Sequence, residues 1–149
     1  MAEHPTIPHN ALVLVGDGRR ALFMRNVGQL MHVKLEVVRL LEHGTPRNQD
    51  IVSDRPGRTV LASGPGRSAY EQTDWHHLEE ERFVHVLAQA ISRASVAEPD
   101  LKVVVVMPPK ALGTFREGID AAARKHLWAE IHKDLAGLAP HEIERHLQP

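Results

Sequence analysis

The sequence predicts a single α/β domain, residues 1–149, built in three layers: a mixed, mostly parallel β-sheet that opens with an antiparallel hairpin, with helices packed on it. Three observations predict this class. Asp17-Gly18 is a hairpin turn signal between apolar runs at residues 11–16 and 20–25. Residues 103–106 are four consecutive valines, which is typical of a central strand buried on both faces. After residue 75, patterns of helical and strand period alternate along the chain, which indicates parallel neighbours.

Strands account for the first part of the chain. Residues 11–16 are expected to form a buried strand, and residues 20–25 the strand that returns from the hairpin turn. In residues 33–37, valine and leucine alternate with Lys34 and Glu36. This alternation predicts a third strand with one buried face.

Helices dominate the second part. Asp74 is a suitable N-cap for a helix that begins at residue 75 or 76 and ends near residue 95. Its apolar face would be formed by Phe83, Leu87, Ile91 and Ala94. A second helix, ending near residue 126, is predicted by the apolar stripe of Leu112, Phe115, Ile119 and Ala122. A short strand at residues 127–131 and a last helix after Pro140, anchored by Ile143 and Leu147, would complete the fold. Phe83, Phe115 and Trp128 are expected in the core rather than as stacking platforms.

Composition narrows the possible functions. The formal net charge is −1, so a phosphate-binding surface would have to be local. The absence of cysteine excludes disulfides, thiolate metal sites and cysteine nucleophiles. The sequence has no secretion signal and no run of apolar residues long enough for a membrane span, so a cytoplasmic location without membrane contact is expected. No cofactor is predicted, and the oligomeric state is left open.

A long segment without helical or strand period, at about residues 44–75, is the first candidate for binding. Loops of this length in compact domains are usually functional or disordered. Its arginines are Arg47, Arg55, Arg58 and Arg67, and its turns are shaped by Pro56, Gly57, Gly64 and Gly66. Guanidinium groups suit the phosphates of an RNA backbone. The alternative is a solvated surface loop in which Arg55 pairs with Asp54.

Three smaller groups of residues are weaker candidates. Lys110 and Arg116 follow the valine-rich strand and could bind an anion at the start of the next helix, or the prolines there could simply shape the turn. Asp17, Glu130 and Asp134 are considered as an acidic cluster for Mg²⁺. Alternatively, Asp17 makes the hairpin turn, Glu130 pairs with Lys133 or an arginine, and Asp134 caps a turn. His76, His77, Glu80, Glu81 and His85 share helix faces but have no metal-binding order, so no metal site is predicted.

Four runs occur in order along the chain: LVLVGDGRRA at 12–21, DRPGR at 54–58, PPKALGTFR at 108–116 and AEIHKDL at 129–135. Together they resemble the bacterial host attachment protein family, over about residues 10–147. This resemblance implies the fold of the middle domain of eukaryotic and archaeal class 1 release factors and of Pelota-type rescue factors. In release factors a Gly-Gly-Gln loop precedes a long helix. Here the corresponding run is Gly64-Pro65-Gly66-Arg67-Ser68, and the nearest glutamine is Gln72. The resemblance therefore implies an RNA-facing loop rather than peptide release.

The leading hypothesis is a cytoplasmic, non-catalytic RNA- or ribosome-associated domain whose basic loop contacts phosphate, with the ribosome or a structured RNA as partner. One alternative is a regulatory module that binds a protein partner and affects surface attachment or polysaccharide. The other is an enzyme, either a metal-dependent nuclease relying on the acidic cluster or a peptidyl-tRNA hydrolase relying on Gln72.

Overall fold

The computed structural model describes residues 6–43 and 69–149 of the chain. Its centre is a five-stranded sheet in the order β3-β2-β1-β4-β5. The strands are β1 (Leu12–Gly16), β2 (Arg20–Asn26), β3 (Leu35–Glu42), β4 (Val103–Met107) and β5 (Leu127–His132). β2 runs antiparallel to both β1 and β3, whereas β4 runs parallel to both β1 and β5. The predicted mixed α/β sheet opened by a hairpin is therefore confirmed, but the sheet is half rather than mostly parallel.

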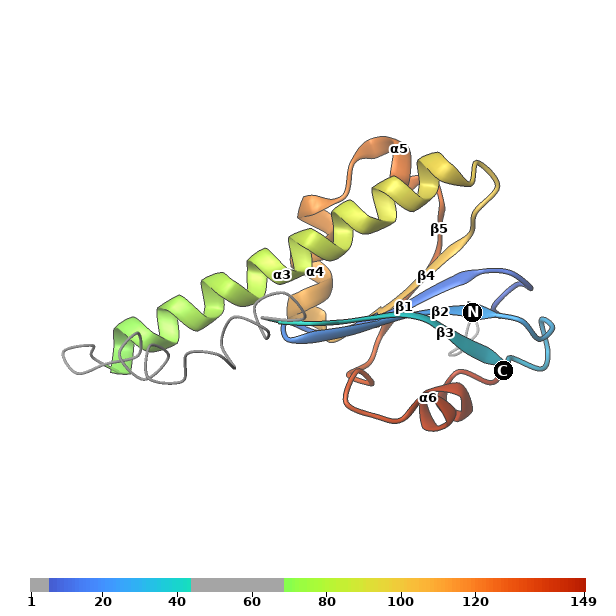
Figure 1. Ribbon diagram of the computed structural model, residues 1–149, viewed down its shortest axis with the longest axis horizontal. Helices are drawn as coiled ribbons and strands as arrows, with labels where there is room; N and C mark the ends of the chain where they lie inside the picture. The colour runs from blue at the N-terminus through green and yellow to red at the C-terminus, as the bar shows by residue number, and fades with distance from the viewer. Residues whose placement is uncertain (1–5, 44–68) are drawn as a thin grey trace, which may run out of the picture.

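Helices cover both faces of the sheet, as Figure 1 shows. α3 (Ala69–Ala97), α4 (Pro109–Gly118) and the short α5 (Ala121–Arg124) lie on one face, and α6 (Pro140–His146) lies on the other. Each face has its own apolar core. Phe23, Leu87 and Phe115 belong to the core under α3 and α4, whereas Met24 and Ile143 belong to the core beside α6. The predicted three layers follow from this arrangement.

The central strands are buried for the reason that the sequence indicated. Val103, Val104, Val105 and Val106 are all fully buried, because β4 lies between β1 and β5 and is covered on both faces. The predicted apolar face of α3 is also confirmed: Phe83, Leu87 and Ile91 are buried, and Ala94 packs against the same core.

Two boundaries of the first half differ from the prediction. β3 begins at Leu35 rather than Val33 and continues to Glu42. Apart from Leu35 it is largely exposed, because it is an edge strand. α3 begins at Ala69, so Asp74 lies within the helix and is not its N-cap. The last seven residues of the loop expected at 44–75 are therefore helical, and residues 44–68 lie outside the described part.

The helix expected to end near residue 126 is broken. α4 ends at Gly118, and Ile119 adopts an extended backbone with φ −87° and ψ 138°. The Asp120 carboxylate then accepts a hydrogen bond from the backbone N–H of Ala123 at 2.7 Å and starts α5. Ala123, rather than Ala122, therefore reaches the core. Ile119 stays buried, which explains why the apolar stripe did not reveal the break.

Trp128 is the one predicted core aromatic that the structure places elsewhere. Phe83 and Phe115 are buried, but Trp128 is 48% exposed on the edge strand β5. Its indole N–H donates to the backbone oxygen of Thr6 at 2.9 Å. Lys102 Nζ lies 5.9 Å from the centre of its ring. Ile143 and Leu147 are buried as predicted. None of the helices within the described residues has the length and apolar character needed to cross a membrane.

Candidate functional site

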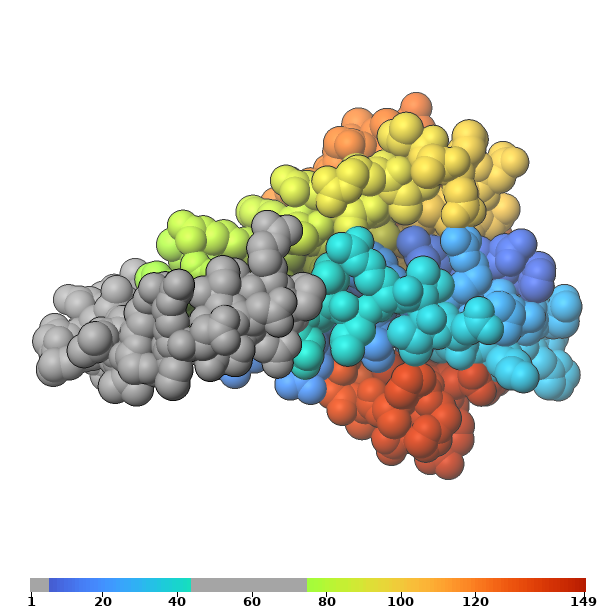
Figure 2. Space-filling view, viewed as in Figure 1, coloured from blue at the N-terminus to red at the C-terminus, as the bar shows by residue number. Residues whose placement is uncertain are grey.

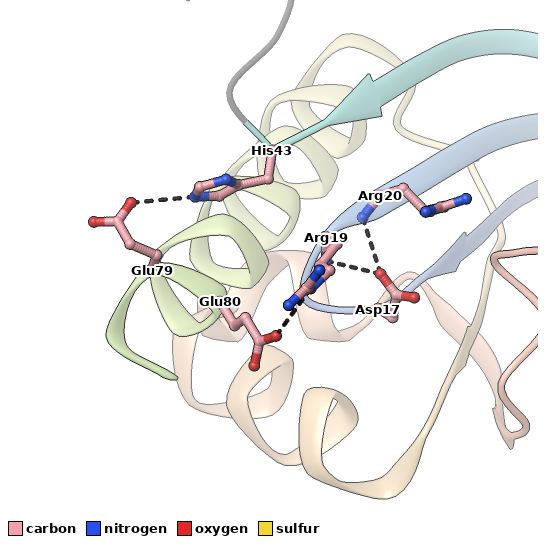
Figure 3. Close-up of polar contacts among 6 residues, drawn as sticks. All are labelled: Asp17, Arg19, Arg20, His43, Glu79 and Glu80. Atoms are coloured by element: carbon pink, nitrogen blue, oxygen red, sulfur yellow. Dashed lines mark hydrogen bonds and ion pairs between the residues drawn. The ribbon is translucent and has the colours of Figure 1, made fainter. Parts of the chain in front are cut away.

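The candidate site lies at the carboxyl ends of the central strands, where the β1–β2 turn, the end of β3 and helix α3 meet (Figure 3). Asp17 forms the turn as the sequence indicated. Its Oδ1 accepts hydrogen bonds from the backbone N–H groups of Arg19 at 2.8 Å and Arg20 at 2.9 Å. The backbone of the turn is thereby fixed, and the exposed Arg19 side chain lies next to Glu80 of α3.

Helix α3 reaches this site because it is long enough to extend beyond the ends of the strands. It has 29 residues, which corresponds to roughly 43 Å. From residue 75 on, its buried side chains begin at Phe83, whereas residues 75–82 are exposed or half-buried. Figure 1 shows the first half of α3 extending beyond the edge of the sheet. This part of the helix can therefore supply polar side chains to a surface site.

A hollow of about 340 Å³ lies between these elements. It is lined by Gly18, Arg19 and Arg20 of the turn, by Glu42 and His43 at the end of β3, and by Trp75, His76, Glu79 and Glu80 of α3. Cationic and anionic side chains are mixed, so the hollow is suited to a polar ligand and not to an apolar one. His43, which lines it, is also the last described residue before the sequence that contains the predicted arginines.

Polar contacts join the β1–β2 turn and the end of β3 to α3 around the hollow, as Figure 3 shows. His43 Nε2 lies 3.2 Å from Glu79 Oε1, and the second oxygen of Glu79 accepts a hydrogen bond from Arg82 at 2.8 Å. Arg19 Nε lies 3.5 Å from Glu80 Oε2. These contacts are exposed or half-exposed, so each contributes little to stability and their main effect is to orient the side chains.

A second, smaller hollow of about 140 Å³ adjoins the first, and the two share Gly18 and Glu80. Lys110, at the start of α4, and His77 line it. Gly18 is required for the close approach of the turn to α3. A Cβ at this position would lie 2.7 Å from Glu80 Cβ, which is closer than real side chains come. The turn and the helix are therefore in direct contact between the two hollows.

The structure separates the two predicted anion-binding residues after β4. Lys110 is exposed and lines the smaller hollow, as a phosphate-binding residue could. Arg116 instead points to β5, where its Nε donates to Glu130 Oε1 at 3.0 Å. The hydrogen bond and the negative charge of Glu130 raise the pKa of Arg116 above its ordinary value. Arg116 is thus already engaged by a carboxylate.

The acidic residues do not form the cluster considered from the sequence. Asp17 is committed to the turn and Glu130 to Arg116, which are the structural roles that the sequence left open for them. Across residues 6–43 and 75–149, no group of three or more histidine, aspartate or glutamate side chains is placed to hold a metal ion. This applies equally to the cluster of Asp17, Glu130 and Asp134 and to the histidines and glutamates at residues 76–85 of α3.

The predicted loop residues lie outside the described part of the chain: Arg47, Arg55, Arg58 and Arg67, and the turn residues Pro56, Gly57, Gly64 and Gly66. In contrast, sequence reasoning missed Arg19, Arg20, His43 and Glu79 as members of the site. The adjacent arginines after Asp17-Gly18 were a usable signal, because a tight turn holds neighbouring side chains at the surface. The approach of His43 to Glu79, 36 residues apart, left no local signal.

Comparison with known proteins finds similar solved structures and a matching protein family. The crystal structure of an archaeal translation termination factor, aRF1, is similar with a TM-score of 0.46 and 17% sequence identity. The alignment covers 91% of this chain, and the chain spans 37% of the termination factor. No curated protein matches the sequence. Residues 12–147 match the family described as "Protein required for attachment to host cells", and the chain belongs to that family.

Proposed function

We propose that this protein is a non-catalytic RNA-binding protein of the cytoplasm that contacts the phosphate backbone of ribosomal or other structured RNA. The observation behind this proposal is the composition of the segment 44–68, together with the place in the fold of the described residues that precede and follow it. It contains four arginines and two aspartates, which gives it a net charge of +2. The described residue before it, His43, lines the 340 Å³ hollow, and so do Trp75 and His76 of the helix that follows it.

Two cationic side chains at the carboxyl ends of the same strands support the proposal. Arg20 and Lys110 are exposed, and neither side chain has an ion-pair partner among the described residues. Arg20 lines the larger hollow and Lys110 the smaller one. Together with Arg47, Arg55, Arg58 and Arg67 they would form a local basic surface on a chain whose net charge is −1. Such a surface binds phosphates without reading sequence, and salt weakens it.

The family description connects this chain to attachment to host cells. An RNA-binding protein would act on attachment indirectly, through the synthesis of the components that attach. In the proposed role the α/β body positions the arginine-containing segment, and no chemical step is required. The near-neutral overall charge would restrict binding to RNA that fits this one edge.

The experiment is co-sedimentation with bacterial ribosomes, together with fluorescence anisotropy on a structured RNA, across a salt series. The test variant replaces Arg55, Arg58 and Arg67 by alanine. A matched control replaces three other cations by alanine, Arg93, Lys125 and Arg145, which are exposed and do not line the hollow. Loss of three phosphate contacts should reduce the slope of log K against log salt by about 2–2.7. Wild-type affinity in the test variant, or an equal loss in the control, would refute the proposal.

A second comparison tests which of the two cationic residues after β4 contributes to RNA binding. Lys110→Ala should weaken RNA binding, whereas Arg116→Ala should change it much less, because the guanidinium of Arg116 is held by Glu130. Anisotropy at low salt measures both. If Arg116→Ala is the more harmful change, then Arg116 leaves Glu130 to bind RNA, and the assignment of Lys110 to the basic surface is wrong.

A further inference from the structure

A further hollow, of about 470 Å³, lies at the amino ends of β4 and β5, whereas the candidate site lies at the carboxyl ends of the strands. Its walls are residues 99–102, which lead into β4, and residues 125–128, which lead into and begin β5. In Figure 2 the end of α3 and the residues that follow it (yellow) lie at the opposite end of the molecule from the part of α3 beside the candidate site (green). The volume is that of a small-molecule site. The hollow is thus a separate candidate for a ligand.

Trp128 is directed to the surface by an irregularity in the sheet. Val103 of β4 lies opposite Leu127 of β5. The next residue of β4, Val104, lies opposite Ala129, so Trp128 is left without a partner in the ladder. Bulges of this kind re-aim a side chain and are common beside functional sites. The ring of Trp128 is 48% exposed, yet its indole N–H donates to a backbone oxygen of the N-terminal segment at 2.9 Å. The structure therefore presents a flat aromatic surface in a fixed orientation, although the sequence favoured a core role for this residue.

Two lysines line the hollow beside this ring. Lys102 Nζ lies 5.9 Å from the centre of the Trp128 indole, near the outer limit of a cation–π contact, and Lys125 belongs to the adjoining wall. Both lysines are exposed and have no ion-pair partner in the described part of the chain. Asp100 is the one carboxylate among the lining residues, so their side chains carry a net charge of +1 when His126 is neutral. A ligand that joins a planar ring to negative charges matches this arrangement.

We propose that this hollow binds a free nucleotide, with its base stacked on Trp128 and its phosphate groups bound by Lys102 and Lys125. Aromatic side chains bind bases of any sequence by stacking, and ammonium groups bind phosphate as point charges. Because Asp100 offsets one of the two lysines, phosphate by itself binds weakly and stacking supplies the rest of the affinity. Structured RNA keeps most of its bases paired, and the basic surface proposed for RNA lies at the other ends of the strands. Nucleotide binding is therefore independent of the proposed RNA binding.

Isothermal titration calorimetry with adenosine diphosphate tests the site. The wild-type protein should bind one molecule per chain with a dissociation constant below about 1 mM, and weaker binding would overturn the proposal. Trp128→Leu removes the stacking surface and should raise the dissociation constant by about tenfold or more, whereas Trp128→Phe keeps a ring and should retain most of the affinity. The matched control, Trp75→Leu, makes the same change at a tryptophan that is 44% exposed in the candidate site, and should bind as the wild type does. Equal losses in the two leucine variants would refute the assigned hollow.

Partial ligands test the two halves of the site. Adenosine lacks the phosphates and pyrophosphate lacks the ring, so each should bind at least about tenfold more weakly than adenosine diphosphate. Lys102→Ala should weaken binding of the diphosphate but not of adenosine. Pyrophosphate that binds as tightly as the nucleotide would show that stacking is not used. A structured RNA added in excess should leave the affinity for the nucleotide unchanged, and displacement of the nucleotide by RNA would refute a separate site for a free nucleotide. Thermal unfolding confirms that each variant is folded, since the replaced side chains are exposed.

Discussion

Asn26 is the polar side chain on which the first part of the fold most depends, and its replacement by aspartate is the sharpest test of the structure. Asn26 is fully buried. Its Nδ2 donates to the backbone oxygens of Ile7 at 2.9 Å and Pro8 at 3.2 Å. Its Oδ1 accepts from the N–H groups of Gly28 at 2.9 Å and Lys34 at 3.0 Å. The amide thus joins the N-terminal segment to the connection between β2 and β3.

Asn26→Asp keeps the shape and both acceptor contacts but removes both donations. The backbone oxygens of Ile7 and Pro8 then face a carboxylate. The Pro8 oxygen keeps its bond from Ala11 N, but the buried Ile7 oxygen loses its donor at a cost of about 1–3 kcal/mol. Burial of the charged carboxylate adds to this cost, so the variant should lose about 3–5 kcal/mol at pH 7. Burial beside carbonyl oxygens raises the pKa of the new carboxyl above its value of about 3.9 in the unfolded chain. The loss should therefore be smallest below pH 4, where the protonated carboxyl can donate once, and should grow as the pH rises through the folded pKa.

Urea unfolding at pH 4 and pH 7 measures this loss, with Asn10→Asp as the control. Asn10 is exposed and has φ 70°, a conformation that aspartate also tolerates, so the control makes the same change of charge without the burial. Equal unfolding free energies for the two variants at pH 7 would show that the four contacts of Asn26 do not stabilise the fold. A loss that is independent of pH would refute the raised pKa.

Three further predictions concern the site and its support. Gly18→Ala should destabilise the protein by about 1–3 kcal/mol in thermal unfolding, because the added Cβ would lie 2.7 Å from Glu80 Cβ, whereas Gly137→Ala, with nothing within 4 Å, should not. Phe115→Ala should lower the free energy of unfolding in urea by about 3–5 kcal/mol, because the side chain is fully buried. A loss no larger than that caused by replacing an exposed side chain would contradict this packing. Asp17→Ala should cost about 1–2 kcal/mol by removing two hydrogen bonds of the turn, and should weaken RNA binding, measured by anisotropy, by loosening the adjacent arginines.

Local pattern was sufficient to predict the elements whose burial follows from their own sequence. The four consecutive valines of β4 indicated a strand buried on both faces, and the apolar stripe of α3 indicated a helix buried on one face. Both predictions are correct. Boundaries were predicted less well. α3 begins at Ala69, and nothing in the helical period of the residues before Phe83 marks that start. The break at Ile119 is equally invisible, because the residue is buried whether or not the helix continues.

The site was predicted only in part, because its members meet through the fold and not along the chain. Lys110 was identified from its place after β4, which is a rule about strand ends that needs no partner. The pairing of Arg116 with Glu130 depends on how α4 lies against β5, which the sequence does not show. The sequence therefore indicated a phosphate-binding arginine and a paired glutamate, but it did not indicate that the two residues pair with each other. The hollow itself combines a turn at residue 18, a strand end at residue 43 and a helix surface at residues 75–80. Since the segment 44–68 joins two of these three elements, its arginines are tied by chain connectivity to the edge that already contains Arg20 and Lys110. For this reason the loss of binding expected on replacing Arg55, Arg58 and Arg67 should be accompanied by a smaller loss in Lys110→Ala, in the same salt-dependent assay.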